Sequence, residues 1–231
     1  MTYFFYRKKS RGIFTKSALI VVFTIFSLSV LYAQNAGGDR AYRQAIEQRA
    51  YKIVAALGLK DSALFYKAQA TVAAQYIELS KLDEKQEAAI RSIKETKTDK
   101  EAVTKKINEA TAETEEARRQ LHQHYMQNLT SMLTTAQIDG IKNGMTYNVL
   151  PITYKGYLDM ISRLTTEEQK FIMEALAEAR EHAMDAGSSE KKHAWFGKYK
   201  GRINNYLSSR GYDVNKESKA WQERIKTRQK Q

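Results

Sequence analysis

The segment "SEKKHAWFGKYKGRINNYLSS", residues 189–209, sets how the C-terminal part of this chain is expected to fold. At 100° per residue it predicts one continuous helix with a bulky apolar face towards the core. That face is formed by Trp195, Phe196, Tyr199, Ile203, Tyr206 and Leu207. Two glycines fall on a separate stripe that carries no bulky side chain.

The glycine stripe needs an explanation, because glycine inside a helix costs about 1 kcal/mol relative to alanine. Such a stripe is expected where another backbone or a ligand must approach the helix closely. Close packing is the favoured interpretation, since packed stripes far outnumber binding stripes. We therefore predict a close-packing strip formed by Ala194, Gly197, Gly201 and Ser208.

Capping signals divide the preceding sequence into helices. A first helix is predicted over about 39–57, where Gly58 ends it, and Asp61 begins the next. A further helix is predicted from Asp99 to about residue 132, with a narrow apolar side. Two long charged helices joined by a short polar turn predict an antiparallel hairpin over about 61–132.

Between the hairpin and residue 189 the signals are mixed. The strings "LTTAQ" (133–137) and "LTTEEQ" (164–169) each place Thr ahead of Gln at capping-box distance, which predicts two helix starts. Between them "MTYNVLPITYKGYLDM", residues 145–160, contains the only proline and several β-branched and aromatic residues. We predict that it is an extended, non-helical connector.

Together these elements predict an all-α fold, with a long antiparallel helical hairpin and a compact C-terminal helical body over about 133–231. Residues 1–33 carry five basic residues and then the apolar run "SALIVVFTIFSLSVLYA". This run is shorter than the roughly 20 residues of a membrane-spanning helix, so it predicts a signal peptide cleaved after Ala33. An uncleaved anchor is the alternative. Residues 34–231 are then a single secreted domain, periplasmic or outside the cell, with no stable membrane insertion.

Composition limits the chemistry and the partners. The chain has no cysteine, which excludes a disulfide framework and a thiolate metal site. The formal charge is +12, but residues 34–187 hold 21 basic and 22 acidic residues, whereas residues 188–231 hold 12 and 4. The basic C-terminal segment favours an acidic polymer or a membrane surface, or it is a solvated face. Export argues against nucleic acid.

Three segments carry a family resemblance: "DGIKNGMTYNVLPITYKGYLDM" (139–160), "LTTEEQKFIMEALAEAREHAMDAGSSEKKHAWFGKYKGRINNYLSSRGYD" (164–213) and the closing "W..RI". With these segments the chain resembles a family of uncharacterised secreted proteins from Bacteroidota, domain of unknown function family 3826. The resemblance implies an all-helical secreted domain, often encoded near glycan-degrading enzymes that include pectin-active ones. It implies no established activity and no catalytic residues.

A ligand site is predicted from aromatic and basic side chains. Flat aromatic faces stack on sugar rings, and cationic side chains pair with uronate carboxylates. The tyrosines would form one wall and the helix at 189–209 the other. The alternative is that the tyrosines belong to the core and have satisfied hydroxyls. The predicted ligand-binding residues are Tyr147, Tyr154, Tyr157, Lys198, Lys200, Arg202, Asn204 and Asn205.

Signals for catalysis and metal binding are weak. His182, Asp185 and His193 form an outside candidate for a metal site, although a helix-end histidine near the negative pole of its helix is favoured. There is no nucleophile elbow, glycine-rich phosphate loop or paired-carboxylate signature, and we expect no cofactor.

The sequence therefore predicts a secreted, non-catalytic accessory or binding protein in polysaccharide use, with a pectin-type acidic glycan as ligand. Two alternatives remain open. "LTTAQ" matches the Leu-Thr-x-x-Gln motif of Spy-like periplasmic chaperones. A glycan lyase needs little beyond a tyrosine base and a charge-neutralising Arg or Lys. The oligomeric state is not predicted.

Overall fold

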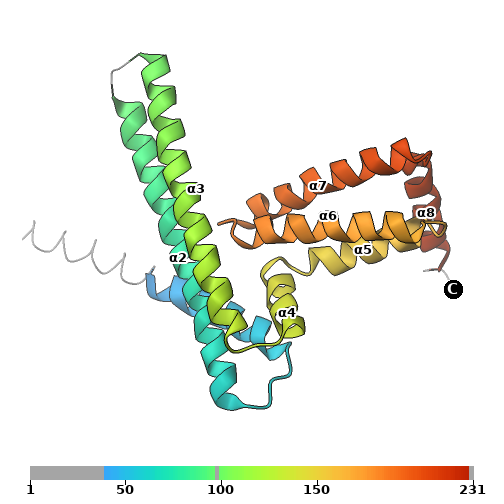
Figure 1. The fold of residues 1–231 in the computed structure, drawn as a ribbon, viewed down its shortest axis with the longest axis horizontal. Coiled ribbons are helices and arrows are strands. Elements are labelled where there is room, and N and C mark those ends of the chain that lie inside the picture. Colours follow the sequence, from blue (N-terminus) through green and yellow to red (C-terminus); the bar gives the residue numbers. More distant parts are fainter. Residues whose placement is uncertain (1–38, 97–98, 229–231) are drawn as a thin grey trace, which may run out of the picture. The chain divides into compact units, whose positions relative to one another are not determined.

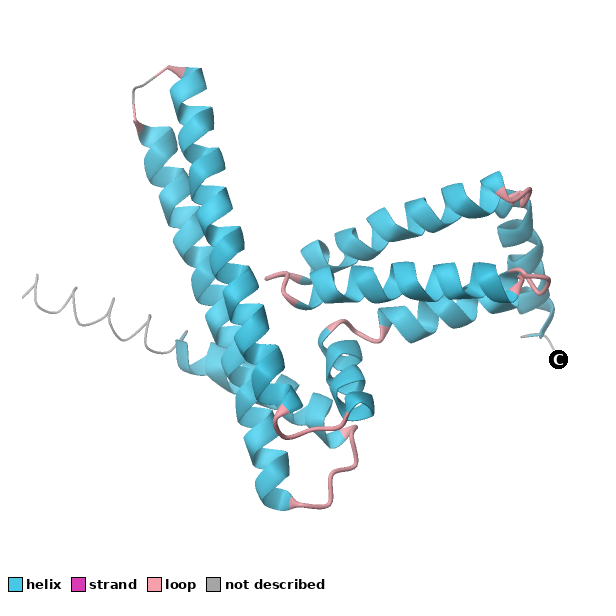
Figure 2. Cartoon of the chain, viewed as in Figure 1, coloured by secondary structure: helices cyan, strands magenta, loops and turns pink. Residues whose placement is uncertain are grey.

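The computed structural model describes residues 39–96 and 99–228, and every element in these ranges is a helix (Figures 1 and 2). The all-α prediction is confirmed, while the predicted signal peptide at 1–33 lies outside the described residues. None of the described helices has the length and apolar composition needed to cross a membrane. Residues 39–55 are helical and precede α2 (Ser62–Glu95), α3 (Lys100–Thr130), α4 (Thr135–Met145), α5 (Val149–Met160), α6 (Thr166–Met184), α7 (Ser189–Ser209) and α8 (Val214–Arg228).

Most predicted helix boundaries are confirmed by their caps. The Asp61 carboxylate accepts from the backbone N–H of Ala63 at 2.8 Å at the start of α2, and Asp99 caps α3. Thr134 and Gln137 form the predicted capping box of α4. At α6 the box pairs Thr165 with a glutamate instead of the predicted glutamine, because the helix begins one residue earlier than the string suggested.

The prediction of an extended connector at 145–160 is wrong. Only three residues separate α4 from α5, and the chain reverses there through Tyr147 and Asn148, whose φ angles are 57° and 56°. Pro151 is the third residue of α5, where its missing N–H removes no hydrogen bond because the first-turn N–H groups have no partner in the helix. Leu150, Tyr157 and Met160 are buried at helical spacing, which favours α5 over a strand.

The chain divides after Ala45, and the second unit, from Ile46 onward, contains two hydrophobic cores. The first lies between residues 46–57, the bases of α2 and α3, and α4. The second lies between α5, α6 and α7, with Trp221 of α8 at its edge. Helices α2 and α3 run side by side as an antiparallel hairpin (Figure 1).

The buried residues of the hairpin all lie near its base. In α2 they end at Leu79, and in α3 they are Tyr125 and Leu129. In the outer half the large apolar side chains, among them Ile90, Ile93 and Ile107, are only half-buried, so this half contributes less apolar burial. The stability of the hairpin therefore depends on contacts at its base, where each fully buried leucine contributes about 2 kcal/mol.

The predicted close-packing strip on α7 is also wrong. Helix α7 is continuous from Ser189 to Ser209 as predicted, but Ala194, Gly197, Gly201 and Ser208 are all exposed. A Cβ atom built on either glycine meets nothing within 4 Å. The face buried against α6 is formed by Lys192, Phe196, Tyr199, Ile203 and Leu207, which leaves the stripe towards solvent.

Close backbone approach occurs instead at glycines of α4. A Cβ on Gly140 would lie 2.6 Å from Leu57 Cδ2, and one on Gly144 would lie 2.9 Å from Ile53 Cγ2. These two glycines are four residues apart and therefore share one face of α4. Small residues at this spacing let α4 pack against residues 46–57.

We predict that Gly197→Ala and Gly201→Ala each raise the free energy of unfolding by about 0.5–1 kcal/mol. Alanine restricts the unfolded chain and meets no obstacle on this exposed face. Urea unfolding followed by circular dichroism measures the change. Gly144→Ala is the matched control and is expected to destabilise, because its methyl group collides with Ile53. Destabilisation by Gly197→Ala equal to that of the control would contradict the prediction.

Candidate functional site

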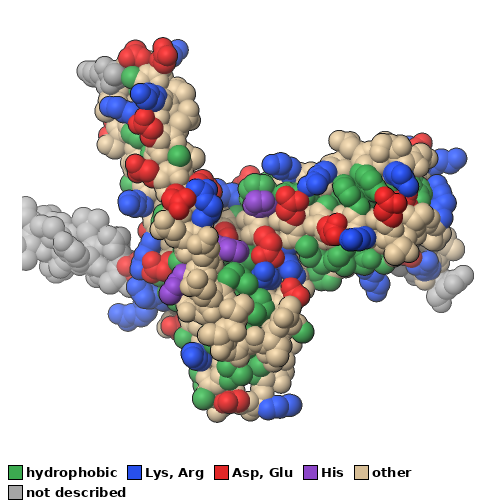
Figure 3. Space-filling model, viewed as in Figure 1, with side chains coloured by type: hydrophobic (Ala, Val, Ile, Leu, Met, Phe, Trp, Pro, Cys, Tyr) green, Lys and Arg blue, Asp and Glu red, His purple; other side chains and the backbone are tan. Residues whose placement is uncertain are grey.

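An open cleft of about 710 Å³ lies between the hairpin and the junction of α6 with α7. In the space-filling view, histidine, acidic and basic side chains gather near this junction (Figure 3). The cleft is therefore a charged site rather than an apolar groove. The side chains that line the cleft include Asp83 of α2, Arg118 and His122 of α3, Glu181 and His182 of α6, Asp185, and Lys191, Trp195 and Lys198 of α7.

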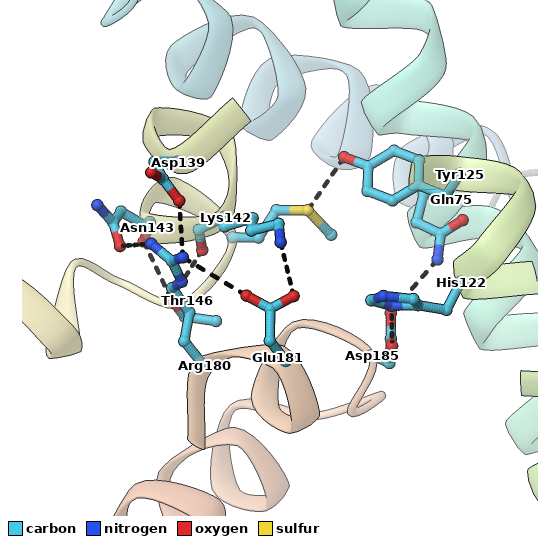
Figure 4. A network of polar contacts seen from close by, with 11 residues as sticks. Gln75, His122, Tyr125, Asp139, Lys142, Asn143, Thr146, Arg180, Glu181 and Asp185 are labelled. Atoms are coloured by element: carbon cyan, nitrogen blue, oxygen red, sulfur yellow. Dashed lines mark hydrogen bonds and ion pairs between the residues drawn. The ribbon is translucent and has the colours of Figure 1, made fainter. Parts of the chain in front are cut away.

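The floor of the cleft is the α6–α7 turn, residues 185–188, which is bound to the hairpin by polar contacts. Asp185 Oδ2 lies 2.6 Å from Nδ1 of His122, and the amide of Gln75 donates to Oδ1 at 3.5 Å (Figure 4). Arg118 donates to the backbone carbonyl of Asp185 at 2.8 Å and to Oδ1 of Asp83 at 2.7 Å. Side chains from both hairpin helices therefore hold one turn.

Gly187 in this turn is required by the close approach of α2. A Cβ atom at Gly187 would lie 1.5 Å from Oδ2 of Asp83. The Asp83 carboxylate is itself held by Arg118, so it is not free to move aside. Gly187 follows the end of α6, and its role is to admit the carboxylate of another helix.

A second polar group joins α6 to α4 beside the cleft. The guanidinium of Arg180 donates to Asn143 at 2.9 Å and to Asp139 at 2.7 Å, and Lys142 donates to Glu181 at 2.7 Å (Figure 4). Arg180 is largely buried, so its charge depends on these partners. This group fixes the helix that carries His182 and Asp185.

The His122–Asp185 pair gives the cleft a titratable group. A carboxylate only accepts hydrogen bonds, so Nδ1 of His122 is the donor in this pair. The hydrogen bond to Asp185 raises the pKa of His122 above its usual 6.5, against the opposing effect of burial. Among the described residues, the only buried side-chain nitrogen or oxygen without a partner is Nε of Arg180. Since no described group bonds Nε2 of His122, that nitrogen is accessible to solvent.

An aromatic and cationic group forms the opposite wall. The rings of Trp195 and His182 stack at 4.3 Å and 15°. The ammonium of Lys198 lies 5.0 Å from the centroid of the Trp195 ring. Within the described part of the chain, no carboxylate lies within 4.0 Å of Lys198. Its charge is therefore open to a ligand.

Lys192 caps the C-terminal end of α6, next to the turn that forms the floor of the cleft. Its ammonium donates to the backbone carbonyls of Ala183 and Met184, both at 2.9 Å, at the negative end of α6. Burial lowers the pKa of Lys192 to about 8. Only 3% of the residue is exposed, so it serves as a helix cap and not as a group that meets ligands.

The predicted two-walled ligand site is not assembled as a unit. Tyr157 is buried and donates to Asn204 at 2.8 Å, so this pair belongs to the packing of α5 on α7. Tyr154 packs on the second core. Arg202 is engaged by Glu178 at 2.9 Å.

The remaining predicted ligand residues are dispersed. Tyr147 stacks on His193 at 5.6 Å, away from the residues that line the cleft, and Lys200 and Asn205 are exposed on α7. Only Lys198 of the predicted set lines the cleft. The expected site failed because Tyr154 and Tyr157 were assigned to a loop but lie in the packed helix α5.

The outside candidate for a metal site is not formed either. Asp185 binds His122, His182 stacks on Trp195, and Nδ1 of His193 contacts the carbonyl of Ser189 at 2.7 Å. The three side chains thus have three different partners. No cluster of potential metal ligands occurs among the described residues.

The fold and cleft define an all-helical protein with a charged, tryptophan-containing cleft between a helical hairpin and a C-terminal body. The family model described as "Protein of unknown function (DUF3826)" matches residues 43–227, and the chain belongs to this family. The resemblance stated from the sequence is confirmed at the level of the family. A comparison with curated proteins finds no match.

We predict that the His122–Asp185 link stabilises the fold in a pH-dependent way. The pKa of His122 is higher in the folded state than in the unfolded state. The stabilisation from the link is therefore complete below the unfolded-state pKa of about 6.5, and it is lost as pH rises through the folded-state pKa. The difference in Tm between the wild type and His122→Gln should therefore be largest at about pH 6 and shrink towards pH 8. Differential scanning calorimetry across this range measures it, and a constant difference would contradict the prediction.

Proposed function

We propose that the chain is a secreted, non-catalytic accessory protein that binds acidic polysaccharide, of the pectin type, in the cleft. The observation that carries the proposal is the position of Lys198 beside the stacked Trp195 and His182 rings. An ammonium without a carboxylate partner, held beside an aromatic pair, suits the carboxylate of an acidic sugar.

The charge balance of the cleft supports an anionic ligand. Its carboxylates already have partners within the protein: Asp83 and Glu115 contact Arg118, Asp185 contacts His122, and Glu181 pairs with a lysine of α4. An incoming anion therefore meets the open charge of Lys198 without first displacing an acidic neighbour. Lys191 adds a second cation, whose only carboxylate contact among the described residues is a long one of 3.9 Å to Asp83.

Features outside the cleft agree with this proposal. Twelve basic and four acidic residues in the segment 188–231 produce a positive field that attracts a polyanion before it docks. The signal-type N-terminus and the resemblance to proteins encoded near glycan-degrading enzymes support an extracytoplasmic glycan as ligand. These features support the proposed class of ligand, and the cleft is its proposed position.

We predict that the protein binds polygalacturonate at low ionic strength and that Lys198→Ala weakens this binding about tenfold. The variant loses one direct charge pair with the uronate, equivalent to about 1.4 kcal/mol. Affinity gel electrophoresis and isothermal titration calorimetry with oligogalacturonate measure the change. Added salt should weaken wild-type binding.

Lys219→Ala is the matched control for this experiment. It removes the same charge from the same basic segment, but Lys219 is exposed on α8 and does not line the cleft. Equal loss in the two variants would indicate diffuse attraction and contradict a site in the cleft. Equal retention of neutral and acidic glycans by the wild type would contradict the proposed ligand.

A lyase is the second candidate, favoured by the His122–Asp185 pair. A histidine oriented by a carboxylate is the arrangement of a general base, and Arg118 and Lys198 line the same cleft as charge neutralisers. Release of unsaturated uronate from pectin fragments, followed by ultraviolet absorbance, would replace the accessory role with catalysis. Such activity should rise with pH as His122 loses its proton.

A further inference from the structure

We propose that His122 makes the cleft selective for a free carboxylate over an ester or a neutral sugar, and that it does so only when protonated. This inference rests on the proposed function, because it assigns a receptor for the acidic group of the same ligand. The inference names the residue that recognises the carboxylate and the protonation state in which that residue recognises it.

The geometry of the His122–Asp185 pair carries the inference. Asp185 occupies Nδ1 at 2.6 Å and fixes the ring, so Nε2 is the nitrogen left for a ligand in the cleft. In the neutral ring Nε2 is a lone-pair acceptor and repels a carboxylate oxygen. In the cation the same atom is an N–H donor and attracts it. One proton therefore changes the site from rejecting to accepting an acid.

The neighbouring charged groups pair with one another, which leaves His122 as the group in the cleft that responds to pH. From α6 it faces Asp185 and Glu181, and from α4 it faces Lys142. Glu181 and Lys142 form their own ion pair, and on the histidine's own helix Arg118 is paired with Asp83 of α2. These pairs are complete before a ligand arrives. Protonation of His122 then neutralises the charge of Asp185, the carboxylate it contacts, and so removes one negative charge that would repel an anionic ligand.

Ester selectivity follows from the same atom. A methyl ester carries no negative charge, so it gains only a neutral hydrogen bond from the imidazolium, and charge-assisted bonds are about twice as strong. Lys198 attracts the carboxylate through a charge that the titration of His122 leaves unchanged. Lys198 therefore favours the free acid at every pH, and His122 adds a further preference for it that exists only at low pH.

The test measures binding of tetragalacturonate and of its methyl ester by calorimetry at about pH 5.5 and 8.5, on either side of an ordinary histidine pKa. Wild-type affinity for the free acid should fall about tenfold from the lower to the higher pH, as expected for one charge-assisted hydrogen bond. The ester forms no charge pair, so it should bind more weakly than the acid at both pH values, and the acid-to-ester affinity ratio should be about tenfold larger at the lower pH.

Two variants separate His122 from other titrating groups. His122→Gln keeps a side-chain amide near Asp185 but cannot become a cation, so its affinity should be weak and independent of pH. Asp185→Asn keeps an acceptor for Nδ1 without the negative charge, so the pH at which binding is lost should move down. Thermal unfolding checks that each variant is folded, and Lys219→Ala should retain the wild-type response.

The outcomes are distinct. A wild type that binds the acid equally at both pH values, or whose acid-to-ester affinity ratio does not change with pH, overturns the inference while the proposed function stands. A pH response that persists unchanged in His122→Gln, or one that Asp185→Asn does not move, also overturns it. A wild type that binds neither ligand at either pH overturns the proposed function as well.

Discussion

The attachment of the α6–α7 turn to the hairpin is the contact on which the arrangement of the cleft depends. Asp185 accepts hydrogen bonds through both its carboxylate and its backbone carbonyl, from α2 and α3 together. Met184, the residue before it, is fully buried in the first core, whereas Ala183 belongs to the second. The turn is therefore where the two cores meet, and its position sets the width of the cleft.

Polar contacts of this kind fix the position of the turn more than they add net stability. Partly buried ion pairs gain little after desolvation is subtracted, but they are costly to break because they leave a charge without a partner. Asp83 cannot move without disturbing Arg118, and its carboxylate fits beside the turn only because residue 187 is a glycine. A cleft lined by such groups keeps its shape while a ligand binds, which favours affinity by reducing the cost of ordering.

Local sequence signals predicted the helices, but they could not predict contacts between residues that are far apart in the sequence. Asp61, Asp99 and Thr134 act on backbone groups within three residues, so their caps could be read directly. The prediction of an extended connector around Pro151 was wrong, because a proline occurs both in loops and in the first turn of a helix. His122 and Asp185 are 63 residues apart. Nothing in either neighbourhood indicated that they meet, although Arg118 and His122 at four-residue spacing marked one polar face of α3.

The titration of His122 connects the stability of the fold to the state of the cleft. Protonation strengthens the bond that holds the α6–α7 turn, and the same proton makes Nε2 a donor towards a ligand. An anion that binds this donor favours the protonated ring, so binding and proton uptake must reinforce each other by linkage. A rise in pH then weakens ligand capture and the anchoring of the turn together. Under the proposed function, release of the ligand does not require a moving lid, because loss of one proton from His122 weakens both the attraction for the ligand and the bond that holds the turn.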